Sequence, residues 1–180
     1  FLSYNIPKKI IYCSYSSKQI HEELGYKKNG IIIKNGIDFS RFKSNNHLRE
    51  KIREELNISK DTFLIGLIGR FDPNKGIDVF IKIVNQLELG SFSAKYLMCG
   101  VDLNNKNKKL DKMLTRYNIK NKIILLGERK DIPSILNGID LLICCSKTES
   151  FGLVLIESIA CGTDVISSDI NDLKSIVGKD

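Results

Sequence analysis

Residues 63–87 read FLIGLIGRFDPNKGIDVFIKIVNQL, and this stretch decides the fold. Residues 63–68 contain no polar side chain, whereas a strand with one face in water alternates apolar and polar residues. Turn-forming Asp72, Pro73 and Asn74 follow, and the apolar residues of 77–87 recur at helical spacing. We therefore predict a strand that is buried on both faces, then a loop, then a helix that packs on the sheet.

The same pattern of an apolar run followed by an amphipathic run recurs toward the C-terminus. Further strands are predicted at residues 95–99, 123–126, 141–145 and 165–167, and further helices at 110–117, 132–137, 152–160 and, beginning, at 173–177. This alternation predicts an α/β fold: an open doubly wound, Rossmann-like parallel sheet with helices on both faces. Ligands of such sheets bind beyond the carboxyl ends of the strands.

The N-terminal part of the chain does not belong to this series. Its residue pattern predicts a strand at residues 9–13, a helix at 16–24, a brief strand at 31–33 and a helix at 47–56. We expect a domain boundary between residues 25 and 40. The start has neither an initiator Met nor a signal-peptide pattern, and the chain stops inside a predicted helix, so we expect a fragment of a longer protein.

The charge of the chain is basic, with a formal net charge of +7 over 180 residues. A basic balance favours anionic partners, such as phosphorylated small molecules, acidic lipids or nucleic acid. The densest run, Lys106 to Lys109, lies among asparagines, and we interpret it as a solvated loop or helix start. No basic-aromatic surface or readout motif indicates nucleic acid, and no apolar run approaches the ~20 residues of a membrane span.

The cysteines show no spacing that would hold a metal. They are Cys13, Cys99, Cys144, Cys145 and Cys161. Four lie in or at the ends of apolar runs, and the two histidines, His21 and His47, are unrelated to them in sequence. We expect buried, reduced thiols, which are typical of a cytoplasmic protein.

The first candidate site residues lie at the junction that follows residues 63–68. Arg70 and Lys75 come at the end of a predicted strand and before a helix, where a planar guanidinium and a mobile ammonium can bind a diphosphate. The alternative is a plain turn, because Asp72-Pro73-Asn74 is good turn chemistry in its own right. The segment is not a P-loop, because no Gly-Lys-Ser/Thr follows a four-residue spacer.

A second junction runs from Glu149 to Glu157. Gly152 lets the backbone approach a ligand, and the unpaired amides of residues 151–153 at the helix start favour an anion. A carboxylate at Glu157 can accept hydrogen bonds from ribose hydroxyls, and Glu149 can accept one from a sugar hydroxyl. The alternative is ordinary helix electrostatics, since acidic residues are common near helix starts.

Several short motifs occur in a fixed order along the chain. They are Lys34-Asn35-Gly36-Ile37-Asp38, Gly69-Arg70 with Lys75-Gly76, Leu126-Gly127 with Asp131-Ile132-Pro133, Gly138-Ile139-Asp140, Glu149 through Glu157, Ala160-Cys161-Gly162-Thr163, and Asp169. This ordered set resembles the glycosyltransferase group 1 family, retaining enzymes with the two-domain GT-B architecture. The resemblance implies that residues 1–30 are the end of an N-terminal acceptor domain plus a linker. Residues 31–180 are then the C-terminal donor domain, truncated at its end.

The resemblance also implies roles for the site residues. Arg70 and Lys75 neutralise the donor diphosphate, amides of residues 151–153 hold the same phosphates, Glu157 holds the ribose, and Glu149 contacts the transferred sugar. The basic pair and the helix start then replace a divalent metal, so no metal or other cofactor is expected. The implied donor-binding residues are Gly69, Arg70, Lys75, Glu149, Ser150, Phe151, Gly152, Leu153 and Glu157, with Arg70, Lys75 and Glu149 as the catalytic members.

The resemblance is not uniform. Lys34 stands where Pro is usual, Ser150 where Gly is more frequent, and Asp164 where Pro is common. Asn171 and Asp172 lie where a pair of glycines is often found, which puts the sugar or acceptor contacts of that loop in doubt. All the charged positions of the motifs are present.

The function implied is transfer of a hexosyl group from a nucleotide-sugar donor to a glycan or lipid-linked acceptor, as in lipopolysaccharide or capsule biosynthesis. We expect the isolated 180-residue chain to be inactive, because the acceptor site lies on the other domain. We expect a cytoplasmic location, with peripheral contact to the anionic inner face of the plasma membrane as a hypothesis. Two alternatives stay open: a nucleotide-sugar epimerase of the same fold, and a non-catalytic module that binds nucleotides or anions.

Overall fold

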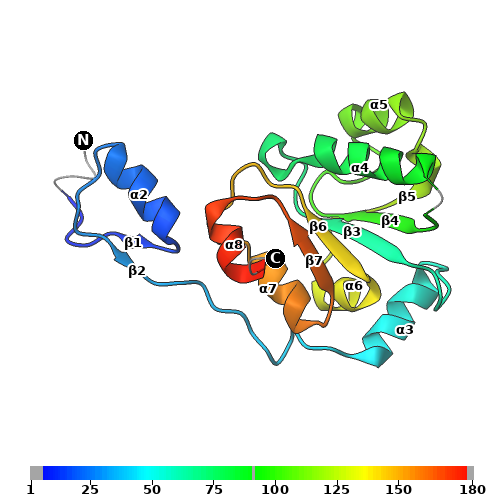
Figure 1. The fold of residues 1–180 in the computed structure, drawn as a ribbon. Helices are drawn as coiled ribbons and strands as arrows, with labels where there is room; N and C mark the ends of the chain where they lie inside the picture. The colour runs from blue at the N-terminus through cyan, green and yellow to red at the C-terminus, as the bar shows by residue number, and fades with distance from the viewer. Residues whose placement is uncertain (1–5, 91, 178–180) are drawn as a thin grey trace.

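The computed structural model describes residues 6–90 and 92–177 (Figure 1). Residues 1–5, where we expect a fragment boundary, lie outside the described part. In chain order the elements are β1 (Ile11–Tyr12), α2 (Tyr15–Glu23), β2 (Ile31–Ile32), α3 (Asn46–Glu55), β3 (Leu64–Ile68), η1 (Pro73–Lys75), α4 (Ile77–Leu89), β4 (Lys95–Cys99), α5 (Lys108–Arg116), η2 (Lys120–Lys122), β5 (Ile123–Gly127), α6 (Ile132–Gly138), β6 (Leu141–Cys144), α7 (Leu153–Ala160), β7 (Asp164–Ser167) and α8 (Asn171–Val177), where η marks a short 3-10 helix.

The larger part of the chain is a five-stranded parallel sheet in the order β5-β4-β3-β6-β7. From β3 the chain moves outward through β4 to β5, then crosses back to β6 on the other side of β3. The strand order therefore reverses between β3 and β6, and their carboxyl ends form the switch point at which ligands of open α/β sheets bind. The predicted doubly wound sheet is confirmed.

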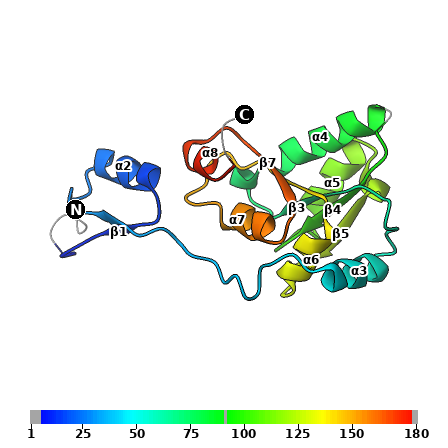
Figure 2. The ribbon, with the colours of Figure 1, turned by 60° about the horizontal axis from the view of Figure 1, so that its bottom comes forward.

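Both faces of this sheet are covered, which explains the apolar strands. On one face, Ile65 and Leu67 of β3 pack in a core with residues of α4 and α5. On the other face, Leu64 of β3 and Leu97 of β4 pack in a second core with α3, α6, α7 and α8. Figure 2 shows α4 and α5 on the side of the sheet opposite to α3 and α6. Successive side chains of a strand point to opposite faces, so a strand between two cores has no position for a polar residue.

The N-terminal segment forms a small unit of its own. β1 and β2 are a parallel pair, and neither strand joins the five-stranded sheet. Residues 33–38 have no regular structure and lead to the larger part (Figures 1 and 2). The small sheet thus includes Ile31 and Ile32, which the expected boundary at residue 30 assigns to the second domain. α2 contacts α8 of the larger part.

An ion-pair network closes the amino edge of the main sheet. Asp140, just before β6, accepts hydrogen bonds from Arg49 at 2.5 Å, from Arg53 at 2.6 Å and from the amide of Leu64 at 2.7 Å. The side chain of Arg53 is only 4% exposed, and it also donates to the carbonyl of Gly138. The buried charge is thus paired on several sides, and the network ties α3 to the starts of β3 and β6.

The element bounds agree with the sequence predictions to within a few residues at each end. α4 continues two residues past the predicted end at Leu87, because the chain has no helix-breaking residue before Gly90. The turn η1 was not predicted as a helix. No helix in the described ranges is long and apolar enough to cross a membrane.

The cysteines agree with the sequence prediction at four of five positions. All five are free thiols, and Cys99, Cys144, Cys145 and Cys161 are buried. Cys13 is only partly buried, so the expectation of a buried thiol is wrong there. Cys13 directly follows β1 in the small N-terminal unit, and neither hydrophobic core of the described residues includes a side chain of this unit.

Candidate functional site

A cavity of about 290 Å³ lies at the carboxyl ends of β3 and β6. It is lined by three segments: the loop after β3, the loop after β6, and one face of α2. The lining residues are Ser16, Ser17, Ile20, His21, Arg70, Asp72, Asn74, Lys75, Thr148, Glu149 and Ser150. The structure thus brings together Arg70, Lys75, Glu149 and Ser150 from the sequence-predicted set, at the point where the strand order reverses.

The loop after β3 places Lys75 by a tight turn. Asp72 caps η1, because its carboxylate accepts the amide of Asn74 at 2.8 Å. Gly76 then adopts a left-handed conformation with φ of 63°, and a Cβ there would collide with the backbone of Cys145. A glycine is therefore required at this position for α4 to start so close to the end of β6. The two interpretations of this segment, an ordinary turn and a diphosphate-binding loop, are compatible, since the turn positions Lys75.

The two basic residues are both paired with carboxylates in the described structure. Lys75 Nζ lies 2.5 Å from Glu149 Oε2, with side chains 27% and 17% exposed. Ser146 donates to the same carboxylate oxygen at 3.4 Å. Arg70 Nε lies 3.2 Å from Asp72 Oδ2, and the Arg70 side chain is 68% exposed. An anion that enters this cavity meets Lys75 already paired with a carboxylate, and it competes with Glu149 for the ammonium.

The start of α7 offers backbone donors. Gly152 at its N-cap is buried and left-handed, with φ of 75°, and no side chain caps the helix. A Cβ at Gly152 would collide with Leu173 of α8. The amides that begin such an uncapped helix carry partial positive charge and favour an anion. Phe151, Gly152 and Leu153 are not among the residues that line the cavity, and neither is Gly69.

Glu157 lies one turn into α7 and also does not line the cavity. Its side chain is partly buried, and burial raises the pKa of its carboxyl group, with the charge of Arg41 opposing the shift. Arg41 belongs to the segment that leads from β2 to α3. The structure therefore places Glu157 near this segment, whereas Glu149 lies beside Lys75.

The wall formed by α2 was missed by sequence reasoning. Ser16, Ser17, Ile20 and His21 face the cavity from the N-terminal unit. The ring of His21 is held by a 2.7 Å hydrogen bond between its Nδ1 and the Ser17 carbonyl. Nothing in the spacing of residues 15–23 indicates a site, because this helix meets the loops of the main sheet only in the tertiary structure.

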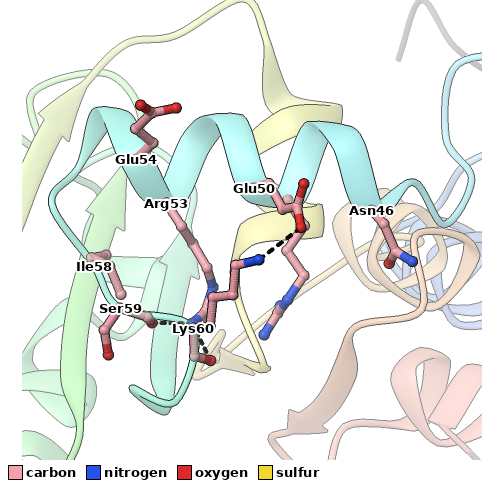
Figure 3. A pocket seen from close by; sticks show the side chains of 8 residues that line it. Asn46, Glu50, Arg53, Glu54, Ile58, Ser59 and Lys60 are labelled. Atoms are coloured by element: carbon pink, nitrogen blue, oxygen red, sulfur yellow. Dashed lines mark hydrogen bonds and ion pairs between the residues drawn. The ribbon is translucent and has the colours of Figure 1, made fainter.

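A larger hollow, of about 570 Å³, lies along α3 at the amino edge of the sheet (Figure 3). Arg53 in this hollow donates to backbone carbonyls of Ser59 and Thr62 as well as to Asp140. Lys60 pairs with Glu50, 3.1 Å apart, as Figure 3 shows. The strong donors here are used within the protein, and the hollow is at the edge of the sheet opposite to the switch point. We therefore place the candidate site at the smaller cavity.

Comparison with known protein families decides the assignment. The model of the family described as "Glycosyl transferases group 1" matches residues 48–180, which is most of the chain. The chain belongs to the group 1 glycosyltransferases. The group 1 glycosyltransferase relatives include the capsular polysaccharide biosynthesis glycosyltransferase CapM of Staphylococcus aureus, which is 28% identical over 94% of this chain and 47% of CapM. A galactosyltransferase of Escherichia coli, described as UDP-Gal:alpha-D-GlcNAc-diphosphoundecaprenol alpha-1,3-galactosyltransferase, is 30% identical over 81% of this chain and 38% of its own length.

Solved glycosyltransferase structures share the fold. Anabaena HepE, crystallised in complex with UDP and glucose, has a TM-score of 0.88 with 24% identity, over 99% of this chain and 49% of HepE. WaaG, a glycosyltransferase involved in lipopolysaccharide biosynthesis, has a TM-score of 0.82 with 18% identity, over 97% of this chain and 48% of WaaG. This group 1 chain spans about half the length of such proteins, and the predicted half of a GT-B architecture is confirmed.

Proposed function

We propose that this chain is the donor-binding half of a retaining glycosyltransferase. In this proposal the whole enzyme transfers a hexosyl group from a nucleotide sugar to a glycan or lipid-linked acceptor in surface polysaccharide biosynthesis. The observation that carries it is the meeting of Arg70, Lys75 and Glu149 in one cavity at the sheet's switch point. The printed functions of CapM and the Escherichia coli galactosyltransferase, and the UDP in the HepE crystal, support the same substrate class.

The chemistry follows from the charge that the reaction creates. When the bond between the sugar's anomeric carbon and the diphosphate breaks, negative charge grows on the leaving diphosphate. Arg70, Lys75 and the amides at the start of α7 stabilise this charge more in the transition state than in the bound donor. Glu157 binds the ribose, and the enzyme needs no divalent metal at the diphosphate in this proposal.

Glu149 has two successive partners in this proposal. Without donor it pairs with Lys75. The incoming diphosphate takes over the ammonium, and the carboxylate of Glu149 is then free to accept a hydrogen bond from a hydroxyl of the transferred sugar. The exchange means that Lys75 and Glu149 stay satisfied in both states, which keeps the cost of opening the pair small.

A calorimetric panel of nucleotide sugars tests the donor assignment. The 180-residue chain is titrated with UDP-, GDP- and ADP-sugars, and we expect one nucleotide class to bind. Lys75→Ala should abolish or weaken this binding, whereas Lys82→Ala on α4, outside the cavity-lining set, should leave it unchanged. Failure of all three classes to bind would contradict the proposal. We expect no transfer by the isolated chain.

Membrane contact is a further part of the proposal. Lys106, Lys108 and Lys109 are exposed at the carboxyl edge of the sheet, the same edge as the candidate site. A cytoplasmic enzyme that rests this edge on an anionic leaflet would bring the site close to a lipid-linked acceptor. Flotation with vesicles that contain phosphatidylglycerol tests it, and replacement of the three lysines by Gln should reduce the bound fraction.

A further inference from the structure

Asp72 occupies a central position in the loop after β3. Its Oδ1 accepts the amide of Asn74 at 2.8 Å, and its Oδ2 lies 3.2 Å from Arg70 Nε. Its backbone carbonyl accepts the amide of Lys75 at 2.9 Å. Asp72 thus contacts both the side chain of Arg70 and the turn that positions Lys75.

The contact with Arg70 is made through Nε alone. In the described part of the chain, neither terminal nitrogen of the Arg70 guanidinium has a partner, and the side chain is otherwise 68% exposed. A carboxylate on the Nε side fixes the plane of the guanidinium while it leaves the two terminal nitrogens for a ligand. Those two nitrogens form the fork that matches two oxygens of a phosphate.

The same loop is tied to the opposite wall of the cavity. The carbonyl of Asn74 accepts the amide of Lys147 at 2.7 Å, and Lys147 lies two residues before Glu149. The residue that Asp72 caps, Asn74, thus also links the loop after β3 to the loop after β6. Both loops contribute to the cavity, so the position of Arg70 is set relative to Glu149 as well as to Lys75.

We propose that Asp72 is a positioning residue that orients the Arg70 guanidinium toward the donor diphosphate. The inference rests on the proposed function and concerns a residue that none of the sequence motifs includes. Its carboxylate opposes simple attraction of an anion, because it adds negative charge beside the site. If Asp72 assists the reaction despite this charge, it does so by orienting Arg70. Such orientation raises the turnover rate of the enzyme–donor complex more than it strengthens donor binding.

Asp72→Asn separates the two contacts of the side chain. The amide oxygen of Asn still caps Asn74, so the turn is kept, but the charged partner of Arg70 is lost. In the full-length enzyme, with whichever of UDP-glucose, GDP-mannose or ADP-glucose the unchanged protein transfers, we expect kcat to fall about five-fold, because the guanidinium is no longer held in the orientation that binds the diphosphate. The KM for the donor should not rise, since the variant removes a negative charge from the site.

A double-mutant cycle with Arg70→Ala shows whether Asp72 acts through Arg70. If it does, Asp72→Asn causes no further loss of kcat once Arg70 is absent. Equal losses in both backgrounds would overturn the inference, and so would an unchanged kcat in the Asp72→Asn protein. The matched control is Asp111→Asn on α5, which breaks a surface pair with Lys120 of η2 and should leave both constants unchanged.

A spectroscopic measurement tests the positioning without any reaction. In the unchanged protein the Arg70 Nε–H signal in a nitrogen-15 NMR spectrum should be resolved and protected from exchange. In Asp72→Asn it should collapse to the position of a free arginine. An already free Arg70 signal in the unchanged protein would overturn the inference. Absence of turnover with all three donors, with the Arg70 signal protected, would instead count against the proposed function alone.

Discussion

Lys75 Nζ and Glu149 Oε2 lie 2.5 Å apart, although 74 residues of chain separate them. The lysine follows β3 and the glutamate follows β6, and these strands are direct neighbours in the sheet. The pair is less than a third exposed on both sides. Its formation joins the two loops that flank the candidate site.

Loss of either basic residue should cost the enzyme most of its rate. Arg70→Ala or Lys75→Ala in the full-length protein should lower turnover by at least about ten-fold, since removal of one donor to a developing oxyanion commonly costs more than this. Steady-state kinetics with the donor found in the binding panel measures the loss. Lys60→Ala, in an exposed pair on the far edge of the sheet, is the control. Normal rates in both site variants would refute the assignment.

Removal of the carboxylate should separate nucleotide binding from sugar transfer. Glu149→Gln frees Lys75 from its partner, so we expect the nucleoside diphosphate product to bind about two- to five-fold more tightly. Transfer should fall, because the variant loses the carboxylate that accepts from the sugar. Calorimetry measures the binding of the nucleoside diphosphate, and a transfer assay on the same preparation measures the rate of sugar transfer. Weaker binding of the diphosphate would show that Glu149 does not compete for Lys75.

Gly152 should tolerate no side chain. Alanine at its φ of 75° is strained, and the new Cβ would collide with Leu173. We expect Gly152→Ala to lower the free energy of unfolding by about 1–3 kcal/mol. Chemical denaturation measures it, with Gly36→Ala as the control, since Gly36 has open space around it and no left-handed φ. Equal stability of the two variants would contradict the close packing of α7 on α8.

The stability of the chain should depend on pH through Glu157. Burial raises the pKa of this carboxyl group in the folded state. Below the ordinary pKa of Glu, the carboxyl group is protonated in both the folded and the unfolded state, so it does not lower the free energy of unfolding there. As pH rises, the unfolded state ionises first, and stability is lost until the pH passes the raised folded pKa.

Glu157→Gln should therefore be more stable than the unchanged chain at neutral pH and equal to it near pH 3. Unfolding free energies measured across this range check the prediction. Equal stability of the two proteins at neutral pH would mean that burial does not penalise the charge. Glu54→Gln, on α3, is the control, since the side chain of Glu54 is exposed.

The sequence by itself determined the element order, the parallel doubly wound sheet and the two junctions that carry charge. The physical reason is local. A strand such as Leu64–Ile68, with one core on each face, needs an unbroken apolar run, and a helix needs its 3.6-residue period. Arg70, Lys75 and Glu149 were recognisable because they follow strands, and carboxyl ends of parallel strands share one edge.

Only the tertiary structure decided which of these residues meet. It paired Lys75 with Glu149, left Glu157 near Arg41, and brought α2 to the cavity. Sequence spacing carries no information on such relations, because they depend on the order of strands in the sheet and on loops whose approach is set by packing. The same holds for β2, which pairs with β1 in the small sheet. An apolar run in the sequence predicts a strand, but it does not show which distant strand becomes its partner.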